Sequence, residues 1–466
     1  MSVLKNTLRN AAQRTSNKPR VSVENYEDGI SPDDMAVAQQ LELDQNTAME
    51  ELNELGHEME IEGQEGEILA EAVDTYPRVV EMIEEDIENN GGVSTESAKY
   101  LNFILDRAGL QGLVNVSVEN FGDNTRRLGE TRVSLEGIKE TLRNWWENLL
   151  NWFKKMREKM KKWWVKNFSA AAAIKSRAAN IVDRAKKITS SNQKEKKLTF
   201  PRLQSTLMTG GKLDATSLAA GLKAATDLGS NIYTSWQEAS IGIADDILDV
   251  VDNATMDANG INSLANGIMD KLKGANAANP EGLHDASGDL PDAYGKNNSA
   301  DYTIKMSAVL PGQKALYLRQ RKNSPQGSGI DGLQNAVDWL TTRAFKLDDS
   351  VKKVQEDRET QIDTLTTQNI ESIAGQVEDF AAVIENYQRN FKKQEDANGN
   401  IDKFKKIADQ ATDENDANVV KAQNLLKKMP NALKDMINEP ATGFAAYFTR
   451  VANAALAVCE KSLAQY

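Results

Sequence analysis

The sequence predicts a mostly α-helical protein, an elongated helical bundle with coiled-coil-like helices and one small β-hairpin near residues 301–320. Charged residues make up 27% of the 466-residue chain and aromatic residues 6%, which suits long solvated helices better than a thick mixed core. Apolar residues recur at spacings of three and four over several long stretches. Only one stretch alternates in the way that a half-buried strand requires.

The first predicted unit is an acidic helical segment, residues 1–136. It holds 28 Asp and Glu against 11 Lys and Arg, which is a net charge of −17. It is rich in Glu, Gln, Leu and Ala, and glycine and asparagine residues divide it into short predicted helices. Its N-terminus lacks the apolar block of a secretory signal, and no run of about 18 apolar residues predicts a transmembrane helix anywhere in the chain.

The second predicted unit, residues 137–200, is a basic amphipathic helix with an alanine-rich continuation. Residues 137–202 hold 18 Lys and Arg against 5 Asp and Glu, a net charge of +13. The alanine-rich residues 169–188 either extend the helix or form the second arm of a helical hairpin. Apolar residues follow one helical face from Gly137 to Phe168; they are Ile138, Leu142, Trp145, Leu149, Trp152, Met156, Met160 and Trp163.

The third predicted unit, residues 201–466, is a mildly acidic helical body. Short helices are expected over residues 203–274, and a loop is expected over residues 275–300, which are rich in Asn, Gly, Asp and Pro. The body has a net charge of −9 over residues 203–466, so the chain is acidic, then basic, then mildly acidic. Such a partition indicates a partner or a processing event.

The hairpin is predicted at residues 301–320 of this body. Tyr302, Ile304 and Met306 alternate with polar residues, and Pro311-Gly312 supplies a turn before a return strand. A lone hairpin is marginally stable in water, so we expect it to pack on helices.

Long helices are predicted to close the chain. Helical periodicity runs from Gly332 to Phe391, and two last helices are expected near residues 416–438 and 441–463. The clearest part is a seam with the spacing of a coiled coil; its residues are Ile370, Ile373, Val377, Phe380, Ile384, Tyr387 and Phe391.

The inventory of reactive side chains predicts a protein that is not an enzyme, with no cofactor and no metal site. His57-Glu58 cannot open a zinc-protease motif, because Ile61 stands where the second histidine is needed. The run of residues 396–400 places Gly399 too early for a calcium loop. Gly210-Gly211-Lys212 lacks the spacing of a phosphate-binding loop, and Cys459 lies in an alanine-rich helix far from either histidine in the sequence.

Five of the seven tryptophans fall within twenty residues, among closely spaced cations. Indole rings settle where apolar and wet regions meet, and Lys and Arg reach anionic groups. The rings either pack on other helices, or this stretch binds a membrane surface or nucleic-acid phosphates. The candidate binding residues are Trp145, Trp146, Trp152, Lys154, Lys155, Arg157, Lys159, Lys161, Lys162, Trp163, Trp164 and Lys166.

Ser or Ala, both small residues, stands two places before glutamate at five positions of the acidic unit. The glutamates are Glu24, Glu50, Glu96, Glu119 and Glu136. Neither Ser-x-Glu nor Ala-x-Glu occurs after Glu136. This tripeptide resembles the cut site of the prohead proteases of large tailed bacteriophages, so the five glutamates are candidate processing sites.

The order of the blocks also resembles the internal head proteins of such phages. The similar features are the acidic leader, the phrase SLEGIKETLRNWWENLLNWFKKM that opens the basic helix, the helical body and the LPGQKALYL hairpin. The resemblance implies a virion structural protein in the capsid interior, whose partners are other capsid proteins, packaged DNA and a prohead protease. It also implies that residues 1–136 are a removable propeptide; a cut after Glu136 would leave a chain with net charge +4. The resemblance is also compatible with ejection of the protein with the genome into the host cytoplasm, where it would contact a membrane surface.

Two other classes of protein stay open. A membrane-binding helical toxin or effector would use its acidic segment to shield the Trp-rich basic helix until release. The other class is an intracellular coiled-coil scaffold without a ligand. In the uncut chain the acidic segment can also fold against the basic helix.

Overall fold

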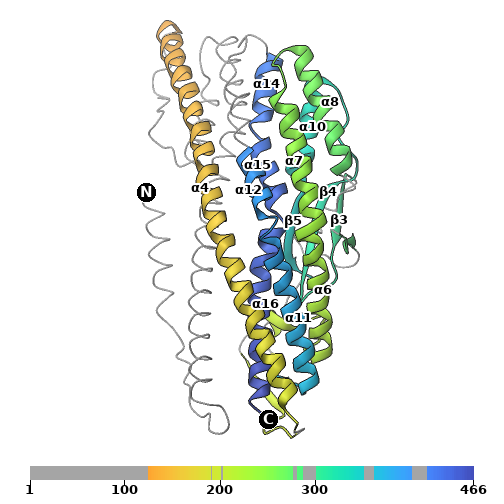
Figure 1. Ribbon diagram of the computed structural model, residues 1–466. Helices are drawn as coiled ribbons and strands as arrows, with labels where there is room; N and C mark the ends of the chain where they lie inside the picture. The colour runs from red at the N-terminus through yellow and green to blue at the C-terminus, as the bar shows by residue number, and fades with distance from the viewer. Residues whose placement is uncertain are drawn as a thin grey trace. The chain divides into compact units, whose positions relative to one another are not determined.

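The computed structural model of this chain describes residues 124–189, 192–200, 203–275, 281–286, 301–350, 361–400 and 417–466. Helices dominate these residues, as predicted, and short strands form two small antiparallel sheets (Figure 1). The helices are α4 (Asn124–Lys187), α5 (Leu203–Leu207), α6 (Ala215–Asn231), the π-helix η1 (Ile232–Trp236), α7 (Gln237–Asp252), α8 (Ala258–Ala275), α10 (Gly329–Thr342), α11 (Thr367–Tyr387), α12 (Phe391–Asn400), α14 (Ala417–Leu426), α15 (Met429–Asn438) and α16 (Ala441–Leu463). The strands are β1 (Lys197–Thr199), β2 (His284–Asp285), β3 (Tyr302–Met306), β4 (Lys314–Arg321), β5 (Ala344–Asp349) and β6 (Gln361–Asp363).

The basic helix is longer than predicted. Helix α4 begins at Asn124 and not at Gly137, and it runs unbroken to Lys187. The alanine-rich stretch therefore extends the helix and does not form a hairpin. No proline interrupts its 64 residues, and Ala and Lys favour the helical backbone. Its last turn carries Arg184, Lys186 and Lys187, where the helix dipole favours positive charge.

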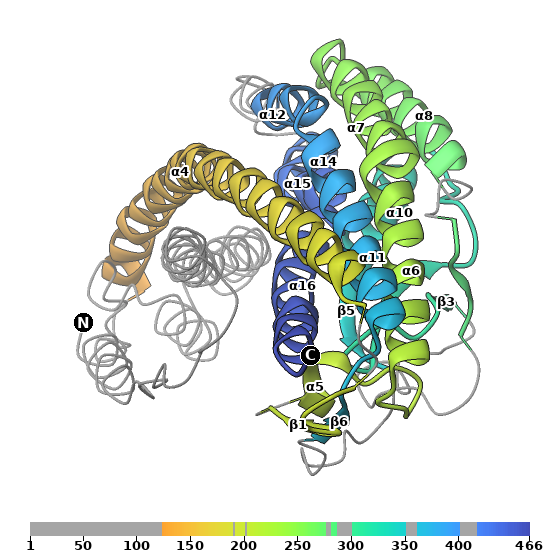
Figure 2. The ribbon, with the colours of Figure 1, turned by 60° about the horizontal axis from the view of Figure 1, so that its bottom comes forward.

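The larger hydrophobic core lies where α11 packs against α4, α6 and α16 (Figures 1 and 2). The predicted seam of α11 is confirmed as a buried face, because all its residues from Ile370 to Tyr387 are at most 2% exposed. The Phe380 ring lies 4.3 Å from the Phe448 ring of α16, centroid to centroid. Helix α6 approaches so closely that a Cβ atom on Gly229 would lie 2.9 Å from the Phe444 ring, which explains the glycine there.

A second core lies among α7, α8, α10, α14 and α15. Trp339 of α10 is fully buried in it. The helix predicted near residues 416–438 is divided in two, since α14 ends at Leu426 and α15 begins at Met429. Pro430 stands in the first turn of α15, where the missing N–H of proline costs no helical hydrogen bond. The helix predicted at residues 441–463 is confirmed as α16.

The predicted hairpin is confirmed as β3 and β4, with Ile304 paired with Arg319. Gly312 in its turn has φ +74°, and a Cβ atom there would lie 2.7 Å from the carbonyl oxygen of Ser205. Two more strands join the hairpin in the antiparallel order β2-β3-β4-β5. Strand β2, with His284, falls inside the segment predicted as a loop.

The prediction of continuous helical structure from Gly332 to Phe391 is wrong. Helix α10 ends at Thr342, Arg343 is extended, and β5 then pairs with β4. Strand β6 follows and pairs with β1 before α11 begins. The sequence AFKLDD of β5 has a strand-like alternation, since Phe345 and Leu347 pack on the larger core between polar neighbours, and the longer helical pattern obscured it.

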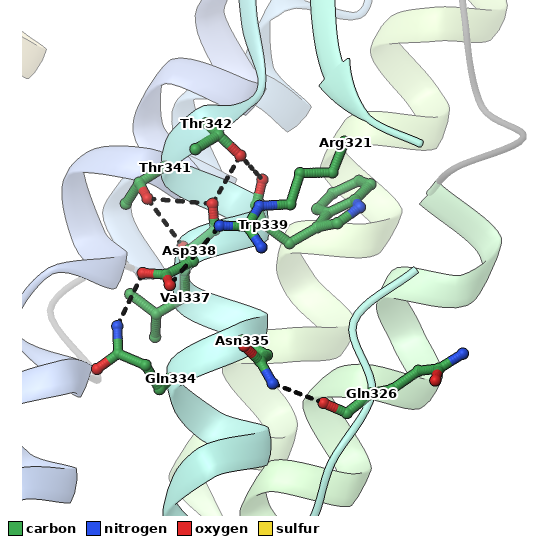
Figure 3. Close-up of polar contacts among 9 residues, drawn as sticks. All are labelled: Arg321, Gln326, Gln334, Asn335, Val337, Asp338, Trp339, Thr341 and Thr342. Atoms are coloured by element: carbon green, nitrogen blue, oxygen red, sulfur yellow. Dashed lines mark hydrogen bonds and ion pairs between the residues drawn. The ribbon is translucent and has the colours of Figure 1, made fainter. Parts of the chain in front are cut away.

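Polar contacts join the sheet to α10 (Figure 3). The guanidinium of Arg321 on β4 lies 3.7 Å from the carboxylate of Asp338 on α10, and the Gln334 amide donates to that carboxylate at 2.8 Å. Thr342 donates its hydroxyl to the backbone carbonyl of Asp338 at 2.7 Å in the last turn. The Arg321–Asp338 pair thus links β4 to α10, while the other two contacts lie within α10.

The proposed boundary at Glu136 lies inside α4, between Asn124 and Lys187. Residues 1–123 lie outside the described residues. The division into units 1–136, 137–200 and 201–466 therefore stays a prediction.

Candidate functional site

The candidate site is the stretch of α4 from Trp152 to Lys166, and its two faces differ. Trp152, Trp163 and Trp164 are 7%, 4% and 0% exposed, so the aromatic face is turned into the protein. Met156 and Met160 lie on the same buried face. The side chains of Trp145 and Trp146 lie outside the described residues.

Trp164 is the centre of a cluster of aromatic rings. Its centroid lies 5.0 Å from that of Tyr387, 5.3 Å from Phe168 and 6.1 Å from Tyr233. Edge-to-face and offset contacts of this kind stabilise a core beyond the area that they bury. Trp152, Trp163 and Trp164 are therefore too buried in this fold to contact a membrane or nucleic acid. Any binding by this stretch would have to use its cations.

The Tyr387 hydroxyl extends this cluster into a buried polar network. It donates to the Gln394 side-chain carbonyl at 2.5 Å, and the Gln394 amide donates to Asn438 at 2.8 Å. Burial raises the pKa of Tyr387, which keeps its hydroxyl protonated as a donor. The network joins α11, α12 and α15. It could not be predicted from the sequence, because isolated Gln and Asn residues give no periodic signal.

The cations of α4 divide into those tied to the fold and those facing outward. Lys161 forms an ion pair with Glu395 of α12 at 2.7 Å, and this hydrogen-bonded partner raises the Lys161 pKa. Lys159 and Lys166 are partly buried and also have partners, while Arg157 is partly buried with its guanidinium close to Gly399. Because of these contacts, fewer cations of α4 are available to bind another molecule.

Lys154, Lys155 and Lys162 are exposed, and no ion pair holds them within the described parts of the chain; we call them the lysine face. Lys155 and Lys162 are seven residues apart, so they lie on the same side of the helix about two turns apart. Glu158 is the only acidic residue from Lys154 to Lys166, and it is exposed between them. The lysine face therefore keeps a positive charge that can meet an anionic polymer.

Beyond Lys166, two cations of α4 fasten it to other helices. Arg177 donates two hydrogen bonds to the Glu460 carboxylate of α16, at 2.8 and 2.6 Å, and one to Asn453 at 3.1 Å. Lys175 pairs with Glu385 of α11 at 2.8 Å. Their partners lie more than 200 residues away in sequence, so composition alone could not separate these structural cations from the lysine face.

Of the five candidate processing glutamates, the structure describes only Glu136. Glu136 is a residue of α4 and directly precedes Gly137. Glu24, Glu50, Glu96 and Glu119 lie outside the described residues, as does His57.

Other candidate sites offer little chemistry. Among the described residues, no group of three or more His, Cys, Asp or Glu is placed to hold a metal ion, and no helix is long and apolar enough to cross a membrane. Cys459 is buried, which raises its thiol pKa and disfavours the thiolate. An open polar cleft of about 410 Å³ lies at the turn between α7 and α8, where Asp257 accepts the backbone N–H groups of Asn259 and Gly260 and so caps α8.

Comparison with protein families finds a match over most of the chain. The family described as phiKZ-like phage internal head proteins matches residues 56–461, which include all of α4. No curated protein and no solved structure matches this chain.

Proposed function

Because the chain belongs to the phiKZ-like phage internal head proteins, we propose that it lies beside packaged DNA and contacts the phosphates through the lysine face of α4. The family makes the chain a structural component of the phage head, in the capsid interior. The observation that carries the DNA contact is the outward position of Lys154, Lys155 and Lys162 on a helix whose aromatic face is buried.

The charge balance supports a processed form as the DNA-bound form. The full chain has a net charge of −13, whereas residues 137–466 have a net charge of +4. Phosphates at high density repel an acidic segment of charge −17, and they attract clustered lysines by release of counterions. Removal of residues 1–136 therefore changes the sign of the interaction between chain and DNA.

The processing enzyme in this proposal is a prohead protease that cuts after small-x-Glu. Glu24, Glu50, Glu96 and Glu119 are sites within the leader, and Glu136 is the last site. The mature chain then stays with the other capsid proteins and the DNA, and leaves the head when the genome is ejected. Peptide mapping of purified phage particles tests this: we expect an N-terminus at Gly137 and no peptides from residues 1–136. A chain that begins at Met1 or Ser2 in mature particles would overturn it.

DNA binding is tested by the salt dependence of affinity for double-stranded DNA, measured on the full chain and on the chain that starts at Gly137. Replacing Lys154, Lys155 and Lys162 with Gln removes three phosphate contacts, which should make the slope of log affinity against log salt about 2.7 less negative. The matched control replaces Lys223, Lys271 and Lys273, which pair with aspartates on α6, α7 and α8, and should keep the slope. Equal slopes for both triple variants would exclude the lysine face.

The alternative class, a membrane-binding toxin, depends on tryptophans at the surface. The three tryptophans of α4 with described side chains are buried, so no structural observation favours that class.

A further inference from the structure

The proposed cut site lies within a continuous helix. Glu136 and Gly137 are the thirteenth and fourteenth residues of α4. In an α-helix each backbone N–H is bonded to the carbonyl four residues earlier, so the groups that a protease must bind are already occupied. Cleavage of such a bond requires local unfolding, and its rate then follows the population of the open form.

Glycine weakens the helix at this bond. Gly137 directly follows Glu136, and Gly129 lies eight residues before it. Glycine loses more backbone entropy than alanine when it becomes helical, so each glycine raises the fraction of time that the helix is open nearby. The candidate bond therefore has a structural reason to open.

Glu158, farther along α4, is better protected. Glu158 lies between Met156 and Met160, which are 4% and 8% exposed, and opening the helix there would bring both side chains into water. The buried face then continues with Trp163 and Trp164. Helix stability thus increases from the glycines toward the anchored part of α4.

We infer that α4 gates its own processing: the bond after Glu136 is cut only when the helix unfolds locally at Gly137. This inference rests on the proposed processing of the chain. It makes the rate of the last cut depend on the stability of α4 as well as on the tripeptide.

The test is limited proteolysis of the full chain with a glutamyl endopeptidase, with the rate of cleavage after Glu136 followed by mass spectrometry. The reference is a synthetic peptide of residues 131–142, which is too short to hold a stable helix alone. We expect slower cleavage in the chain than in the peptide. Gly137→Ala should lower the chain-to-peptide rate ratio by about fivefold, the equivalent of about 1 kcal/mol of helix stability.

The peptide with the same substitution removes any direct effect of alanine on the protease. Gly242→Ala is the matched control, because Gly242 lies in α7 with open space around its Cβ position, and it should leave the ratio unchanged. Equal rates in chain and peptide, or a ratio insensitive to Gly137→Ala, would overturn the gating. The N-terminus found in phage particles tests the proposed processing separately, because it does not depend on these rates.

Discussion

The ammonium group of Lys434 lies 4.1 Å from the centroid of the Trp152 ring. Trp152 is buried and belongs to α4, whereas Lys434 is half-buried and belongs to α15. Burial lowers the Lys434 pKa, and the negative face of the indole ring partly compensates the charge. The contact therefore anchors the basic helix to α15 at the start of its described buried face.

Substitutions of Trp152 and Lys434, singly and together, should reveal the interaction between the two side chains. In a double-mutant cycle with Trp152→Leu and Lys434→Met, we expect an interaction free energy of about 0.5–2 kcal/mol, measured by denaturant unfolding. If the losses of unfolding free energy in the two single variants add up to the loss in the double variant, the two side chains do not stabilise each other.

Trp164→Ala should lower the free energy of unfolding by about 3–5 kcal/mol, because it removes a large ring from a closely packed aromatic cluster. Its neighbour Val165 is 55% exposed, so Val165→Ala is the control and should change stability by about 0.5 kcal/mol at most. Denaturant unfolding of both variants checks the prediction. A small loss for Trp164→Ala would contradict the structural role of this tryptophan.

The two hydrogen bonds between Arg177 and Glu460 should contribute about 1 kcal/mol, because the pair is bidentate but its side chains are 19% and 37% exposed. A double-mutant cycle with Arg177→Met and Glu460→Gln measures this coupling, which should fall at high salt. The exposed pair Lys223–Asp227 serves as the control and should show about 0.5 kcal/mol or less. Coupling no larger than in the control would show that Arg177 does not fasten α4 to α16.

Glu439, after the end of α15, should make stability depend on pH. Burial, and then the charge of Asp435, raises its pKa to about 7. An ordinary glutamate has a pKa of about 4.3, so the folded state binds this proton more tightly than the unfolded state. The contribution of Glu439 is therefore complete below about pH 4 and is lost as pH rises through about 7, by at most about 4 kcal/mol.

Unfolding of Glu439→Gln and of the parent chain at pH 5 and pH 8 measures this effect. The variant should lose less stability than the parent between the two pH values. Glu238→Gln, whose side chain is 59% exposed, should behave as the parent does. An identical pH dependence for Glu439→Gln would contradict the raised pKa.

Several elements could be predicted because their signals are local. The seam from Ile370 to Tyr387 identified α11, and alternation around Ile304 with a Pro-Gly turn identified the hairpin. Strand β5 was missed, because six residues between two helical patterns carry a weaker signal than the helices and depend on pairing with β4. The candidate cations can be identified from the sequence. The sequence does not show that Lys161 pairs with Glu395 whereas Lys154 faces outward, because this depends on where α12 packs.

The sequence by itself determined the partition of charge, the apolar faces of α4 and α11 and the five Ser-x-Glu or Ala-x-Glu sites, because these are properties of neighbouring residues. The tertiary structure alone decided which face of α4 is covered. Trp164 is buried by rings from Tyr233 of η1 and Tyr387 of α11, which lie far away in the chain and meet it only in the folded protein. Burial of an aromatic face depends on such distant partners, and periodicity shows that a face is apolar without showing what covers it.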